Sequence, residues 1–165
     1  MSRLLIKQKV FSWTDSYEVY DSNDYPKYDV KADFFSIGHR IRVYEKGTGR
    51  EVGLIQEKVL RLFKEYDIYV NGSYQGIVKQ QFSLLRPKYN IDYKGWKLSG
   101  DIFEWNYDIY EYSRLVVHIS KELFHWGDTY VLEIEDARDE LPALMVAIAM
   151  DAAKCSEEGN RNSFL

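Results

Sequence analysis

The two arginines of Arg40-Ile41-Arg42 are the residues best spaced for binding an anion. Successive side chains of a strand point to opposite faces, so this alternation puts both guanidinium groups on one face and turns Ile41 inward. Two such groups can grip a phosphate through bidentate hydrogen bonds. The candidate residues for binding an anionic headgroup are Arg40, Arg42, Lys27 and Lys31, provided that the adjoining strands pair. We favour the alternative interpretation, a charged solvent face that discourages aggregation.

Residues that could perform catalysis or hold a metal form no known pattern. The histidines His39, His118 and His125 include no pair at the i, i+4 spacing of zinc-protease helices. His118 lies on the polar face of its strand, as a surface histidine would, and Cys155 has no activating base near it in sequence. The nucleophile elbow, the phosphate-binding loop and the dinucleotide fingerprint are absent. We predict a chain that is not an enzyme and has no catalytic residue, metal site or cofactor.

Five carboxylates gather where the last strand gives way to a helix, namely Glu133, Glu135, Asp136, Asp139 and Glu140. Carboxylates that converge on a barrel rim can carry out acid-base chemistry, which keeps an enzyme as a third hypothesis. We favour a solvated connection whose acidic residues complement the dipole at the helix N-terminus.

The composition sets the class of protein. A chain of 165 residues is long enough for one core and too short for two ordinary domains. Its formal charge of -4 and its pI near 5.4 give no global attraction to nucleic acid or to anionic membranes, although they leave room for a local basic patch. Nonspecific binding to nucleic acid is therefore disfavoured. A single cysteine excludes an internal disulfide and is typical of a reducing compartment.

No segment has the pattern expected for export or for spanning a membrane. Arg3, Lys7 and Lys9 interrupt the first apolar stretch before a secretory signal could form. The longest apolar run, 141–150, has about ten residues where a membrane span needs about twenty. We expect a cytoplasmic protein with no transmembrane segment, one that the predicted headgroup site would bring to a membrane surface as a peripheral protein.

A two-strand unit recurs at intervals of roughly 24 residues. Its copies begin near Ile6, Val30, Ile55, Val78, Ile102 and Ile119. The first and last copies, 6–17 and 119–130, share Ile, Phe, Trp, Asp and Tyr at equal spacing, and Asn71-Gly72 suits a type I′ turn. Six such units predict about twelve antiparallel strands, which tend to close because closure removes unpaired edges.

The C-terminal part predicts one buried helix. Asp139 and Glu140 suit a helix N-terminus, and Pro142 suits its first turn. The stretch 144–150 is apolar on every side, so other elements must surround it. We predict a single all-β domain over 1–155, a closed antiparallel barrel of about twelve strands around a hydrophobic C-terminal α-helix. Residues 156–165 lack periodicity and are expected to form a mobile tail.

Several segments together resemble one known family. They are LIKQKVFSW at 5–13, GHRIRVY at 38–44, KYNI at 88–91, GW at 95–96 with GD at 100–101, WGDTY at 126–130 and the final apolar helix. Over nearly the whole chain they resemble the LURP-one-related family of the tubby C-terminal-like superfamily. The resemblance implies a tubby-like barrel of twelve strands around a hydrophobic helix and a protein without enzymatic activity. One plant branch of the family is linked to pathogen defence.

The resemblance bears on function only through relatives. They include tubby domains, which bind phosphoinositide headgroups, and the phospholipid scramblases. The basic residues of the tubby headgroup site have no counterpart that we can assign position by position, so that site is not carried over. We predict a non-catalytic binding or scaffold module that recognises a partner protein or an anionic phospholipid headgroup. The alternative is a carrier of a small apolar ligand in the barrel, although a central helix would leave it little volume.

Overall fold

The computed structural model describes residues 1–7, 16–33, 38–84, 86, 88–124 and 127–162. In chain order its elements are β1 (Ser2–Ile6), β2 (Tyr17–Asp21), β3 (Pro26–Asp33), β4 (Arg40–Glu45), β5 (Glu51–Glu57), β6 (Glu65–Val70), β7 (Ser73–Gln81), β8 (Lys88–Asp92), β9 (Trp96–Asp101), β10 (Asn106–Glu111), β11 (Arg114–Phe124), β12 (Gly127–Ile134), the 3-10 helix η1 (Ala137–Asp139) and helix α1 (Glu140–Asn162). The predicted match between 6–17 and 119–130 falls largely outside the described residues.

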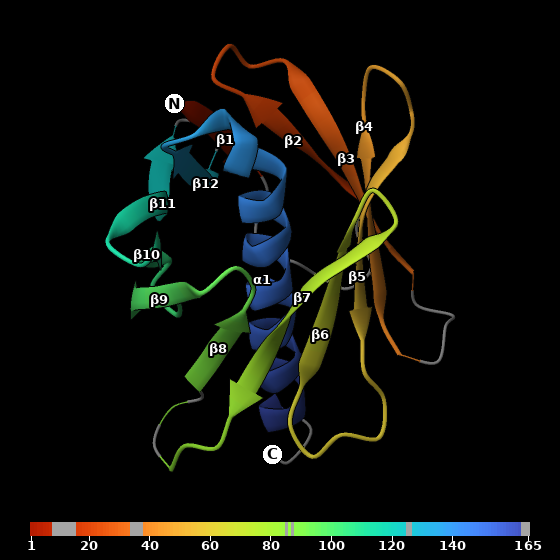
Figure 1. The fold of residues 1–165 in the computed structure, drawn as a ribbon, viewed down its shortest axis with the longest axis vertical. Coiled ribbons are helices and arrows are strands. Elements are labelled where there is room, and N and C mark those ends of the chain that lie inside the picture. The colour runs from red at the N-terminus through yellow and green to blue at the C-terminus, as the bar shows by residue number, and fades with distance from the viewer. Residues whose placement is uncertain (8–15, 34–37, 85, 87, 125–126, 163–165) are drawn as a thin grey trace.

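All twelve strands of the described residues belong to one antiparallel sheet, and consecutive strands are neighbours except for β8 and β9. Strand β1 also pairs with β12, where Leu4 lies opposite Leu132, and the sheet curls into a nearly closed barrel (Figure 1). Strands β8 and β9 stand at the two ends of the strand order, with no ladder between them in the described part of the chain. The predicted antiparallel barrel of about twelve strands is confirmed, with one open seam in place of full closure.

Period-two alternation decides which side of each strand faces the core. In β10, Tyr107 and Ile109 are buried, while Asp108 between them is only half-buried. Turn chemistry separates the strands as predicted. Asn71 and Gly72, between β6 and β7, have φ values of 49° and 77°, the positive values that a type I′ turn requires.

Helix α1 runs down the centre of the barrel (Figure 1). All eight side chains from Ala143 to Met150 are at most 2% exposed. Each large aliphatic side chain among them gains about 1.5–3 kcal/mol by leaving water. The predicted helix, apolar on every side and surrounded by strands, is confirmed. It occupies the place where a carrier would hold its ligand.

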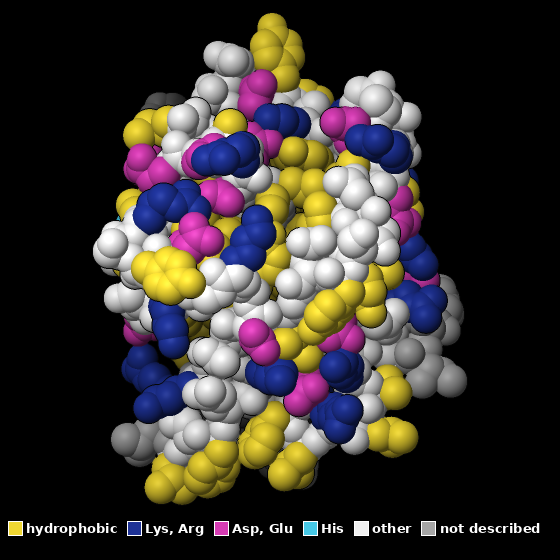
Figure 2. Space-filling view, in the orientation of Figure 1, with side chains coloured by type: hydrophobic (Ala, Val, Ile, Leu, Met, Phe, Trp, Pro, Cys, Tyr) yellow, Lys and Arg dark blue, Asp and Glu magenta, His cyan; other side chains and the backbone are white. Residues whose placement is uncertain are grey.

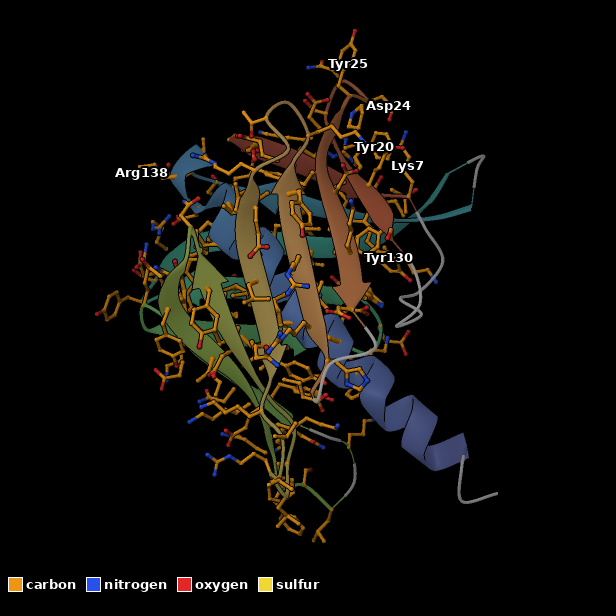
Figure 3. The ribbon with its side chains drawn as sticks, turned by 90° about the vertical axis from the view of Figure 1, so that its right-hand side faces the viewer. Lys7, Tyr20, Asp24, Tyr25, Tyr130 and Arg138 are labelled. Atoms are coloured by element: carbon orange, nitrogen blue, oxygen red, sulfur yellow. The ribbon has the colours of Figure 1, made fainter. Side chains whose placement is uncertain are left out.

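Helix α1 continues to Asn162, past the predicted boundary between 155 and 156. Figure 3 shows its last turns projecting beyond the strands. Outside the barrel a helix has no apolar face to bury, which explains why the sequence there shows no hydrophobic period. The division into a domain over 1–155 and a mobile tail over 156–165 stays a prediction.

Glycine lets strand β5 approach the helix closely. A Cβ added at Gly53 would lie 2.3 Å from Sδ of Met145 and 3.3 Å from Cβ of Val43. No side chain has room there, so the helix packs directly on the backbone of the strand.

We expect Gly53→Ala to lower the free energy of unfolding by about 1–3 kcal/mol, because the new methyl group must displace Met145 in a packed core. Gly47→Ala is the matched control, since a Cβ at Gly47 would meet nothing within 4 Å. Its effect should stay within about 0.5 kcal/mol. Urea denaturation followed by circular dichroism measures both variants. Equal stabilities would show that the helix does not rest on β5 in this way.

Candidate functional site

Strands β3 and β4 bring three of the four predicted anion-binding residues together. Lys31 and Arg42 are direct cross-strand partners, and Arg40 lies two residues before Arg42 on β4. Because Ile41 and Val43 are buried, both arginines stand on the outer face beside Lys31. We call Lys31, Arg40 and Arg42 the basic strip.

Polar neighbours already engage both arginines of the basic strip. Arg42 pairs with Asp33, whose Oδ2 lies 3.3 Å from Nη1, and with Glu51, whose Oε2 lies 3.4 Å from Nε. Arg40 donates a hydrogen bond from Nε to the side-chain oxygen of Gln56. A phosphate would have to compete with these partners, which lowers the affinity that the strip can offer.

Lys27, the fourth predicted residue, does not join the basic strip. It lies four residues before Lys31, which is roughly 13 Å along an extended strand. Its Nζ lies 2.7 Å from Oε1 of Glu140 at the start of helix α1. The ammonium group of Lys27 therefore faces the helix, away from the two arginines.

Glu140 is the centre of a polar cluster that fixes the start of helix α1. The residue is 7% exposed, and its carboxylate accepts hydrogen bonds from Lys27 Nζ, Tyr28 Oη and Ser2 Oγ. Burial raises the pKa of Glu140, but these three hydrogen bonds outweigh it and hold the pKa below its usual value. Burial, reinforced by the Glu140 carboxylate, raises the pKa of Tyr28, which therefore remains a hydrogen-bond donor.

The acidic residues near this cluster are only in part the solvated connection predicted from the sequence. Glu133 and Glu135 are exposed, in agreement with that prediction. For Asp139 and Glu140 the prediction was wrong, since both are only 7% exposed. Oδ2 of Asp139 accepts a hydrogen bond from Nη1 of Arg114 at 2.8 Å. Each carboxylate is paired with a cation from a strand, Asp139 with Arg114 and Glu140 with Lys27. A buried charge is tolerated when it is paired in this way.

A second basic surface, which the sequence reasoning missed, lies at the other end of the barrel. It is formed by 58–64, between β5 and β6, and by 79–88, from the end of β7 to the start of β8. We call the described residues of these two segments the loop tip. The rings of Phe63 and Phe82 meet edge to face, with their centres 6.3 Å apart. This contact places the two segments side by side.

The loop tip exposes large apolar side chains. Leu60 is 100% exposed, Leu62 is 91%, Leu84 is 88% and Phe82 is 70%. Figure 2 shows hydrophobic side chains projecting at the lower end of the molecule, with Lys and Arg side chains close above them. Bare apolar groups gathered in one place with a polar rim mark an interaction surface.

The loop tip is also basic. Its two segments hold six of the 22 Lys and Arg residues and none of the 26 Asp and Glu residues. Acidic residues outside the loop tip pair with four of the six: Lys58 with Asp67, Arg61 with Glu65, Lys64 with Glu57 and Arg86 with Asp101. Lys79 and Lys88 have no ion pair with any residue that the structure describes. The pattern KVLRLFK at 58–64 is the signal by which this surface could have been found.

A polar hollow of about 280 Å³ adjoins the loop tip. Glu57, which is 6% exposed, lines it and accepts hydrogen bonds from Lys64 Nζ and from the main-chain nitrogen of His39. Burial raises the pKa of Glu57, but the hydrogen bonds from Lys64 and His39 outweigh it and leave the pKa below its usual value. At neutral pH Glu57 is a carboxylate that holds the ammonium group of Lys64 in place.

The two histidines that the structure describes contact different carboxylates. Nδ1 of His118 lies 2.6 Å from Oδ1 of Asp108, and His39 contacts Glu57, while His125 lies outside the described residues. Among the residues with a described position, no three His, Cys, Asp or Glu side chains are grouped as a metal site would require. No helix in that part of the chain combines the length and the apolar character needed to cross a membrane.

The fold and the sequence define the class of protein. The chain matches the pattern of LURP-one-related proteins over residues 2–151. It belongs to the LURP-one-related family, as the resemblance read from its sequence predicted.

One bacterial protein is similar in sequence, and one solved structure is similar in fold. The uncharacterized protein YxjI of Bacillus subtilis (strain 168) is 27% identical over 158 residues, which cover 96% of this chain and 97% of that protein. The X-ray structure of an Arabidopsis thaliana protein is similar with a TM-score of 0.61 at 16% identity, covering 92% of this chain and 90% of the plant chain. The second likeness concerns the fold alone.

We expect Glu140→Gln to lower the free energy of unfolding at pH 7 by about 1–3 kcal/mol, because a neutral amide replaces the carboxylate that binds Lys27. The pKa of Glu140 is lowered in the folded state, so its contribution is fully present above the ordinary glutamate pKa. It is lost as the pH falls through the lower folded value. The difference between variant and parent should therefore shrink below about pH 4.

Urea denaturation at pH 7, 5 and 3 measures this difference. Glu133→Gln is the control, because the Glu133 side chain is 53% exposed, and it should change stability little at each pH. A deficit for Glu140→Gln that is the same at all three values would contradict the role given to its charge.

Proposed function

We propose that this protein is a non-catalytic binding module that docks on the anionic surface of a phospholipid membrane through the loop tip. The observation that carries the proposal is the combination of bare apolar side chains and cations at one end of an acidic protein. Apolar side chains gain free energy in the boundary between headgroups and acyl chains. A Lys or Arg without an acidic partner, as Lys79 and Lys88 are among the described residues, adds about 1 kcal/mol on an anionic surface. In this role the protein is cytoplasmic and peripheral.

The shape of the loop tip favours a membrane over a protein partner. Leu60 and Leu62 project from one segment, and Phe82 and Leu84 project from the other. A fluid interface receives side chains that project separately, whereas a protein interface encloses its central anchors in fitted pockets. The cations behind the apolar side chains match the place of the headgroups in such a docked state.

Two features support binding without catalysis. Helix α1 fills the barrel, where an enclosed active site or a carried apolar ligand would need space. The buried carboxyl groups of Glu57 and Glu140 have lowered pKa values and are held by cations. A general acid at neutral pH needs the opposite, a raised pKa and freedom to give up its proton.

The basic strip takes a smaller part in this proposal. Arg42 is held between two carboxylates, and Arg40 is engaged by Gln56. Among the described residues of β3 and β4, none is an exposed large apolar side chain of the kind that insertion requires. It therefore serves as the internal comparison for the loop tip.

Co-sedimentation with vesicles tests the apolar part of the proposal. We expect binding to phosphatidylglycerol vesicles, little binding to phosphatidylcholine vesicles, and a loss of binding as salt rises. Leu60→Ser combined with Leu62→Ser should weaken binding more than about tenfold, because each buried leucine contributes about 1.5–3 kcal/mol. No binding by the parent to either vesicle would remove the membrane proposal and leave a protein partner as the binding role.

The same assay tests the charges. Lys79→Gln combined with Lys88→Gln should weaken binding to phosphatidylglycerol and flatten its salt dependence. Arg40→Gln combined with Arg42→Gln removes the same number of charges from the basic strip and should change binding less than about threefold. A larger loss from the arginine pair than from the lysine pair would transfer the site to the basic strip.

A further inference from the structure

The seam between β8 and β9 opens into a groove beside the loop tip. The main-chain nitrogen of Trp96 donates to the carbonyl oxygen of Tyr93 at 2.8 Å, which makes a tight turn between the two strands. Figure 1 shows the strands diverging from this turn. The groove has a volume of about 840 Å³, within the range of sites for small ligands.

Apolar side chains line most of this groove, namely Phe82, Leu84, Tyr89, Leu98, Ile102 and Phe103. Tyr89 and Ile102 are each 8% exposed, and the rings of Tyr89 and Phe103 lie 6.4 Å apart. Phe82 and Leu84, by contrast, are exposed and belong to the loop tip. The groove therefore runs from the edge of the core to the surface proposed to meet the membrane.

Cations line the same groove. Arg86 is 71% exposed, and among the described residues its acidic partner is Asp101, at 3.4 Å. Lys88 is exposed and makes no ion pair with the described residues. Both groups are of the type that can form charge-assisted hydrogen bonds with a phosphate. An apolar trough flanked by cations is complementary to an anionic amphiphile.

The strand edges along the seam are poorly suited to pairing with an added peptide. Strand β8 has only five residues and carries Lys88 and Asp92 at its ends. Strand β9 carries Lys97 and Asp101, and Gly100 breaks its regular backbone with a φ of 110°. Short edges, charges and backbone irregularities are the means by which proteins prevent strand addition. The groove therefore suits an apolar ligand, which needs no hydrogen bonds to the strand edges, better than an added peptide strand.

We propose that this groove binds one acyl chain of an anionic phospholipid, with the phosphate against Arg86 and Lys88. The inference rests on the proposed function, because docking through the loop tip brings the groove to the lipid. The proposed function has the loop tip contact the bilayer as a whole. The groove would in addition bind a single lipid molecule.

The probe is dihexanoyl-phosphatidylglycerol kept below its micelle concentration, and the readout is the shift of backbone amide signals in NMR spectra. We expect saturable shifts at Leu98, Gly100 and Ile102. Glycerol phosphate, which has the charge without the acyl chains, should produce none at these positions. Shifts confined to Arg86 and Lys88 and equal for both compounds would mean anion binding alone and would overturn the proposal.

Leu98→Trp places a larger ring in the groove and should weaken binding of the monomeric lipid at least about tenfold. Leu54→Trp is the matched control, since Leu54 is also a partly buried strand leucine but lies on β5, away from the groove. It should bind as the parent does. Leu84→Gln, at an exposed position that leaves the core unchanged, should weaken binding about threefold. Parent-like affinity in both groove variants would sink the proposal.

Leu60→Ser combined with Leu62→Ser separates the groove from membrane docking, because neither residue lines the groove. This variant should bind the monomeric lipid as the parent does, but its binding to vesicles should be weakened. If the parent binds vesicles but the lipid causes no NMR shifts at the groove residues, the acyl-chain site is overturned and membrane docking stands. If the lipid shifts the groove residues but the parent does not bind vesicles, membrane docking is overturned and the acyl-chain site stands. Shifts along β8 and β9 that appear only with an extended peptide of alternating Val and Lys would assign the seam to strand addition and overturn the lipid site.

Discussion

The burial of helix α1 is the constraint on which the rest of the structure depends. Between Ala143 and Met150 the helix is apolar on every side, so it is stable only where strands surround it. The sheet needs the helix equally, because a barrel of twelve strands without it would enclose a wide lumen. Gly53 shows how closely the two fit, since even a methyl group there would collide with Met145. Helix and sheet therefore stabilise each other.

The two ends of the barrel use their charges in different ways. At the start of the helix, buried Asp139 and Glu140 are matched by Arg114 and Lys27, so the cations there hold the fold together. At the loop tip the acidic partners lie outside the two basic segments, and Lys79 and Lys88 have no acidic partner among the described residues. The same residue types thus have a structural role at one end and a candidate binding role at the other.

Local patterns made the fold predictable, and long-range contacts limited the prediction of the site. Strand alternation correctly put Arg40 and Arg42 on one face, but it could not reveal the carboxylates beside Arg42. Lys27 turns toward Glu140, which lies 113 positions away in sequence. In a sequence, an apolar residue such as Leu60 is expected to lie in the core, and only the structure shows that it is exposed. The loop tip was therefore not predicted. The number of strands likewise does not predict whether the first and last strands of the sheet pair. Only the structure shows that β8 and β9 do not.

The composition of the loop tip suits reversible docking. An exposed leucine gains about 1.5–3 kcal/mol when it is fully buried, whereas association costs about 4–15 kcal/mol in lost freedom of motion. Four partly inserted apolar side chains therefore roughly balance the cost of association and leave little net affinity on a neutral surface. The cations then decide the outcome, because their contribution exists only where the lipid headgroups are anionic. Two signals of this kind, neither sufficient alone, give a protein that responds to the charge of the membrane.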